Sequence, residues 1–149
     1  MGMRETTRSL RAYFIIAGAI ALLLGLRDLS TVTKLGSILG SLPASWQLAL
    51  WFPLLSQLAL AACFIWAGVQ LPAALTRGAG WIKTLMLVTI VVQIVDMALV
   101  ASVLGTELGT TALIRSFIAL LIAAYLLANI RRLADEAMAK NATAQVVQR

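Results

Sequence analysis

Histidine is absent from this chain, and cysteine occurs only once, at Cys63. Without imidazole, the common form of haem ligation, most zinc sites and the usual catalytic base are excluded. A single cysteine cannot form an internal disulfide, and we interpret Cys63 as a small packing residue within an apolar run. The sequence also lacks a glycine-rich phosphate loop and paired carboxylates at catalytic spacing. It therefore predicts a protein that is not an enzyme and that carries no cofactor or metal.

Charged side chains are also scarce, which excludes an ordinary soluble domain. They make up 12% of the 149 residues, whereas hydrophobic residues make up 61%. Soluble domains are about 25% charged, because their surface must be covered with polar groups. We therefore predict an integral membrane protein whose surface mostly contacts membrane lipids.

Four apolar segments account for most of the chain, and each is long enough to cross a bilayer. They span residues 10–26, 46–71, 81–104 and 112–130. A hydrocarbon core of about 30 Å needs about 20 helical residues at a rise of about 1.5 Å each. Membrane β-strands alternate apolar and polar residues, and these segments do not. The sequence predicts an all-α integral membrane protein, a bundle of four transmembrane helices.

One compact domain with short flanking segments is the simplest organisation. We expect residues 1–9 to form a basic arm, residues 10–130 the four-helix transmembrane domain, and residues 131–149 a polar tail that is weakly helical and frayed from residue 133. No small-residue cleavage site follows the first apolar run before Arg27. We therefore expect this run to be retained rather than removed as a signal peptide.

The connection between the first two spans, residues 27–45, is longer than a simple loop requires. Apolar residues recur in it every three or four positions, namely Leu29, Val32, Leu35, Ile38, Leu39 and Leu42. This period predicts a short amphipathic helix that lies in the outer membrane interface. The alternative is an ordered lid over the bundle. The two differ in whether the apolar face contacts lipid or protein.

Positive charges divide unequally between the two sides of a four-helix topology. Nine lie on the side of both termini, and three on the other side. The nine are Arg4, Arg8, Arg11, Arg77, Lys83, Arg131, Arg132, Lys140 and Arg149, and the three are Arg27, Lys34 and Arg115. An excess of Lys and Arg marks the cytoplasmic side, so we expect both termini in the cytoplasm and the chain in the cell (inner) membrane. Because this bias accounts for the net charge of +6, we expect no nucleic-acid partner.

Asp96 is the polar residue that the sequence marks most strongly as a candidate for function, because it lies well inside the third span. An ionised Asp at the centre of a membrane helix costs about 2.5–3.5 kcal/mol on insertion scales. Thr89 and Gln93 precede it at spacings that place all three on one helix face. Gln57 and Arg115 lie at comparable depth in neighbouring spans. We therefore expect an Asp96–Arg115 ion pair with Gln57 and Gln93 as hydrogen-bond neighbours.

Two interpretations of this polar cluster remain open. In the first, which we favour, Asp96 and Arg115 form a structural clamp that fixes the register of the helices. In the second, Asp96 is a binding or proton-relay carboxylate, since ionisable groups inside membranes are often functional. One acid beside one base is typical of a clamp, whereas a proton pathway usually contains several acids.

Small residues in the first span form a second candidate feature. Ala17, Ala21 and Gly25 follow one another at intervals of four and lie on one stripe of the helix. Small side chains let two helix backbones approach closely within a membrane. The stripe predicts helix packing, either inside this bundle or against another chain.

A chain of this size offers little interior volume for a substrate. We therefore expect an accessory, assembly or scaffold subunit that packs against copies of itself or against a larger membrane-protein partner. The alternative is a homo-oligomeric small transporter or channel, with its site at Gln57, Gln93, Asp96 and Arg115.

Overall fold

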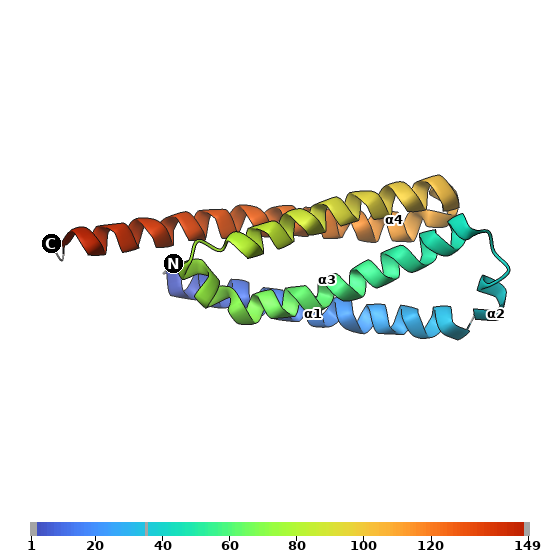
Figure 1. Cartoon of the computed structure of the whole chain (residues 1–149), viewed down its shortest axis with the longest axis horizontal. Coiled ribbons are helices and arrows are strands. Elements are labelled where there is room, and N and C mark those ends of the chain that lie inside the picture. The colour runs from blue at the N-terminus through green and yellow to red at the C-terminus, as the bar shows by residue number, and fades with distance from the viewer. Residues whose placement is uncertain (1–2, 35, 148–149) are drawn as a thin grey trace.

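The computed structural model describes residues 3–34 and 36–147 and contains only helices, turns and short connections within them. The helices are α1 (Met3–Lys34), α2 (Gly36–Leu39), α3 (Ala44–Thr76) and α4 (Gly80–Val147). Helix α4 folds back on itself, so that its two arms run antiparallel to each other, beside α1 and α3 (Figure 1). The predicted all-α bundle of four long helical segments is confirmed.

Gly105 creates the reversal within α4. Its backbone angles, φ 72° and ψ 173°, lie in a region that is essentially open only to glycine. The apolar parts of the two arms are Gly80–Val103, called here the first arm, and Thr110–Lys140, called the second arm. One residue with this conformation therefore separates the third span from the fourth.

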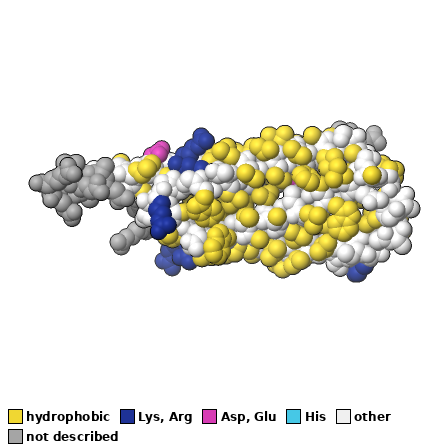
Figure 2. All heavy atoms as spheres, in the orientation of Figure 1, with side chains coloured by type: hydrophobic (Ala, Val, Ile, Leu, Met, Phe, Trp, Pro, Cys, Tyr) yellow, Lys and Arg dark blue, Asp and Glu magenta, His cyan; other side chains and the backbone are white. Residues whose placement is uncertain are grey.

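All four long segments are apolar and long enough to cross a membrane. Besides the two arms, these segments are Thr6–Lys34 in α1 and Ala44–Thr76 in α3. Hydrophobic side chains cover most of the length of the bundle, and Lys and Arg gather mainly at one end (Figure 2). Both ends of the chain lie near that same end of the bundle (Figure 1). This arrangement fits a protein that spans a membrane four times.

The connection between the first and second spans differs from the predicted amphipathic helix. Helix α1 continues to Lys34, and only Gly36–Leu39 forms a separate helix, of four residues. Thr31 and Thr33 donate hydrogen bonds to carbonyls one turn earlier in α1, so the segment prolongs the first span. Leu39 is buried against protein while its neighbour Ile38 is exposed. Periodicity alone predicted a helix but did not locate its ends.

Both flanking segments are more helical than the sequence suggested. Helix α1 begins at Met3, within the expected basic arm. Helix α4 runs to Val147, so the segment that we expected to be only weakly helical is helical over residues 133–147. Leu133, Ala134 and Ala137 are buried, which explains why the helix persists beyond the predicted end of the span.

The main apolar core lies toward one end of the bundle, and the buried polar side chains lie toward the other, beside smaller apolar residues such as Leu54 and Val100. The apolar core gathers residues from α1, α3 and both arms of α4, near the end that carries the termini. Its fully buried large side chains are Phe14, Leu71, Ile82, Met86, Leu126 and Ile130. Further along the first arm, toward Gly105, the buried side chains include Thr89, Gln93 and Asp96. This uneven division places the polar residues together, away from the best-packed region.

Candidate functional site

Asp96 lies in the first arm of α4 and turns its carboxyl toward α3. Its side chain is 3% exposed, and Thr89 and Gln93, at earlier positions on the same face, are 4% and 9% exposed. Thr89 satisfies its own hydroxyl by donating to the Leu85 carbonyl at 2.8 Å. Thr89 therefore has no hydroxyl hydrogen left for Asp96.

Ser56 of α3 is the hydrogen-bond partner of Asp96, and sequence reasoning did not assign it to the site. Its Oγ lies 3.2 Å from Asp96 Oδ2 and 3.0 Å from the Pro53 carbonyl oxygen. A serine inside a span carries little insertion cost, so nothing in its own context singles it out. Its position in the chain could have indicated it, because Ser56 lies next to Gln57, at a depth in the membrane comparable to that of Asp96.

The hydrogens available at this site do not satisfy an ionised carboxylate. Ser56 has one hydroxyl hydrogen, and both Pro53 and Asp96 offer an acceptor to it. The second oxygen, Asp96 Oδ1, is buried and has no hydrogen-bond partner among the residues that the structure describes. A protonated Asp96 could instead donate to Ser56 Oγ while Ser56 donates to Pro53. With that proton on Oδ2 the carboxyl is neutral and the hydrogen bonds from Asp96 to Ser56 to Pro53 are complete, while Oδ1 stays without a partner among the described residues.

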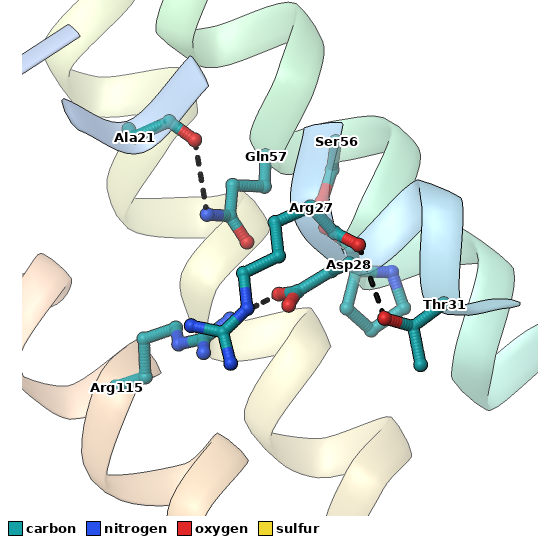
Figure 3. Close-up of polar contacts among 8 residues, drawn as sticks. Ala21, Arg27, Asp28, Thr31, Ser56, Gln57 and Arg115 are labelled. Atoms are coloured by element: carbon teal, nitrogen blue, oxygen red, sulfur yellow. Dashed lines mark hydrogen bonds and ion pairs between the residues drawn. The ribbon is translucent and has the colours of Figure 1, made fainter. Parts of the chain in front are cut away.

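Arg115 does not pair with Asp96, and that prediction is wrong. Its Nη1 lies 2.7 Å from Oδ2 of Asp28 near the end of α1 (Figure 3). Both side chains of this pair are partly exposed, at 49% and 37%. An ion pair at a partly exposed position avoids the cost of burying two charges, which the Asp96 position would impose. The clamp between Asp96 and Arg115 is thus replaced by one between α4 and α1.

Gln57 and Gln93, the other two residues of the predicted cluster, have different surroundings. Gln57 Nε2 donates to the Ala21 carbonyl at 3.3 Å and links α3 to α1 (Figure 3). Gln93 is buried on the Asp96 face, without a side-chain hydrogen bond to the described part of the chain. The structure therefore brings Ser56, Gln93 and Asp96 to the polar interior. Gln57 and Arg115 instead bind residues of α1, namely Ala21 and Asp28.

The small residues of the first span pack inside the bundle. A Cβ atom on Gly25 would lie 2.7 Å from Leu58 Cδ2, and one on Gly18 would lie 2.9 Å from the Ala61 carbonyl oxygen. Ala17 and Ala21 are half-buried beside these contacts. At Gly25 the stripe therefore packs inside this bundle, against α3, which is one of the two uses predicted for it.

Metal ligation has no support from the side chains that the structure describes, because no group of three or more His, Cys, Asp or Glu residues occurs among them. Comparisons with models of known protein families, with curated proteins and with solved structures gave no match. The case for a function therefore rests on the geometry at Asp96 and on the surfaces of the helices.

Proposed function

We propose that this protein is a small transporter or channel, acting as a homo-oligomer, in which Asp96 binds a cation inside the membrane. A proton is the simplest such cation. The observation that carries the proposal is the buried Oδ1 of Asp96, which has no hydrogen-bond partner among the described residues. A structural clamp would pair both oxygens, because an unsatisfied buried polar atom costs about 1–3 kcal/mol.

The distribution of charge supports the same proposal. Arg115, the basic residue expected to neutralise Asp96, is instead held by Asp28 at 2.7 Å. Arg132, further along the same arm, pairs with Glu136 at the terminal end of the bundle. Asp96 therefore has a hydroxyl neighbour, Ser56, and no cationic one among the described residues. A carboxyl in this setting needs a positive charge from outside the chain.

Proton flux into proteoliposomes tests the proposal. The purified full chain is reconstituted with a pH-sensitive dye inside the vesicles, and a potassium gradient with valinomycin supplies the driving potential. We expect the wild-type protein to carry protons. In Asp96→Asn the proton flux should be at least about tenfold slower, since Asn cannot release a proton. Asp28→Asn is the matched control, because it removes a carboxylate that already has a partner. Equal flux in wild type and Asp96→Asn would contradict the proposal.

A role as an accessory or assembly subunit is the second candidate, and the outer face of α3 favours it. Ala59, Ala62 and Cys63 are exposed there, beside Trp66, which is 60% exposed. Small side chains next to one aromatic ring suit the close approach of another membrane helix. Such a contact would lie on the opposite side of α3 from the glycine contacts with α1.

Cross-linking through Cys63 tests for a contact at this face and identifies the neighbour, because Cys63 is the only cysteine of the chain. A homobifunctional thiol reagent is applied to native membranes. A dimer of this chain would support homo-oligomerisation, and a heavier adduct with another protein would support an accessory role. The matched control is Cys63→Ser carrying Ile118→Cys, which moves the thiol to an exposed position on the second arm of α4. The same cross-links from both positions would contradict a specific contact at α3.

We further propose that the chain resides in the inner membrane with both termini in the cytoplasm. The excess of Lys and Arg at the terminal end of the bundle supports this orientation. Reporter fusions at the C-terminus and at Gly40 test it. An enzyme reporter active only outside the cytoplasm should be silent at the C-terminus and active at Gly40, and the reverse pattern would contradict the orientation.

A further inference from the structure

A cavity of about 450 Å³ opens at the end of the bundle that carries the termini. It lies between the start of α1, the end of α3 and the far part of α4. Its lining residues are Thr7, Arg8, Arg11, Pro72, Leu75, Thr76, Ala137 and Lys140. No residue of the Asp96 site takes part in it, so this cavity is separate from the site described above.

The lining combines positive charge, hydroxyl groups and an apolar wall. Arg8 and Arg11 come from α1, and Lys140 comes from α4. Neither arginine forms an ion pair with the residues that the structure describes, although Asp28 and Glu136 each have one. Two guanidinium groups beside one cavity therefore retain their hydrogen-bond donors for a ligand.

The spacing of the lining residues explains why they converge. Arg8 and Arg11 lie three residues apart and share a face of α1, as Ala137 and Lys140 do on α4. Pro72 and Leu75 supply the apolar wall from α3. Each of the three helices thus presents one face to the same opening.

The cavity also lies where the apolar belt ends. Thr7, Arg8 and Arg11 are in the first turns of the membrane-spanning segment Thr6–Lys34, and Lys140 ends the segment Thr110–Lys140. Figure 2 shows the basic side chains at the boundary of the hydrophobic surface. Lipid phosphates lie at this level of a bilayer, next to the acyl chains that the apolar wall would contact.

We propose that this cavity binds a phosphate group, and that the phosphate is the headgroup of an anionic membrane lipid. Arginine donates paired hydrogen bonds that match phosphate oxygens. The wall formed by Pro72 and Leu75 receives the glycerol and the upper acyl chain. This proposal does not depend on the function proposed for Asp96.

Lipid titration of the full chain in a neutral detergent tests the site. Soluble short-chain phosphatidylglycerol is compared with phosphatidylcholine by native mass spectrometry. We expect wild type to bind the phosphatidylglycerol at least about tenfold more tightly. Arg8→Gln with Arg11→Gln should weaken this binding about 25-fold, at about fivefold for each arginine near a lipid surface.

The matched control is Arg77→Gln with Arg131→Gln, which removes the same charge from the same end of the bundle outside the cavity. We expect it to weaken lipid binding by less than about threefold. Equal losses in the two double variants would overturn the site in favour of diffuse surface attraction. Displacement of the lipid by millimolar inorganic phosphate would overturn the lipid as the source of the phosphate. Elution volume and circular dichroism show that each variant is folded before it is titrated.

Discussion

Arg115 and Asp28 join the second arm of α4 to the end of α1 through a contact of 2.7 Å between Nη1 and Oδ2. The two residues are 87 positions apart in the chain. Since α1 packs mainly along α3, this ion pair ties the first and last spans together directly. It also keeps Arg115 away from Asp96, whose hydrogen-bond partner is Ser56.

Removal of the ion pair should cost little stability. Arg115→Ala should lower the free energy of unfolding by about 0.5 kcal/mol, because partly exposed ion pairs contribute about 0–1 kcal/mol. Titration with sodium dodecyl sulfate, followed by circular dichroism, measures the change. The charge swap Asp28→Arg with Arg115→Asp should recover most of the loss. A loss above about 3 kcal/mol for Arg115→Ala would show that the pair is buried in the membrane-embedded protein.

Ser56 and Asp96 should be energetically coupled. Their contact is 3.2 Å, so the single variants Ser56→Ala and Asp96→Asn should not have additive effects on the free energy of unfolding. A double-mutant cycle in the same denaturant titration should give a coupling of about 0.5–3 kcal/mol, as expected for residues in one hydrogen-bond network. The cycle Asp28→Asn with Ser56→Ala supplies an unconnected pair for comparison. Additivity within about 0.3 kcal/mol for Ser56 and Asp96 would argue against the contact.

Gly18 should not tolerate a larger side chain. A Cβ there would lie 2.8 Å from Ile65 Cγ1 and 2.9 Å from the Ala61 carbonyl oxygen, so α1 and α3 would have to separate. We expect Gly18→Ala to lower the free energy of unfolding by about 1–3 kcal/mol through overpacking. Gly80→Ala is the control, because no atom lies within 4 Å of its Cβ position. Equal stability of the two variants would contradict the close packing of α1 on α3.

Gly105 should resist substitution for a different reason. Beyond its chain neighbours, no described atom lies within 4 Å of a Cβ built there, so Gly105→Ala meets no clash with the described side chains. Its φ of 72° with ψ of 173° is nevertheless strained for alanine, at a cost of about 1–3 kcal/mol. The same denaturant titration measures this loss. Unchanged stability would mean that the reversal adopts a different backbone geometry in the membrane.

The sequence predicted the four spans because hydropathy over about 20 residues is a local property of the chain. It also predicted that Gln93 and Asp96 share a face, since helical spacing fixes the angle between them. It did not predict the partner of Arg115. Depth in the membrane gives a residue's height along the bundle, but the direction of its side chain depends on which helices are neighbours. The sequence offers Arg115 two acidic residues in the outer half of the bundle, Asp28 and Asp96. The packing of the helices decides that it pairs with Asp28.

Ser56 and the end of α4 show two further limits of sequence reasoning. Ser56 became a site residue only through its distance to Asp96, which no pattern within α3 encodes. The segment after Ile130 looked like a tail because it is polar on average. Its apolar residues Leu133 and Ala137 share one helix face, and they are buried because the bundle extends further than the apolar spans.

The uneven core has a mechanical consequence for the bundle. Large side chains interlock near the terminal end, so this end should be stiff and serve as a pivot. The opposite half buries smaller apolar groups, among them Leu54 and Val100, and is also joined by the hydrogen bond of Ser56 to Asp96 and the ion pair of Arg115 with Asp28. Separation of the two hairpins there would expose less apolar surface than at the terminal end. If Asp96 binds a cation as proposed, a hinge at the stiff end would open the Asp96 half of the bundle toward one side of the membrane while the terminal end stays closed.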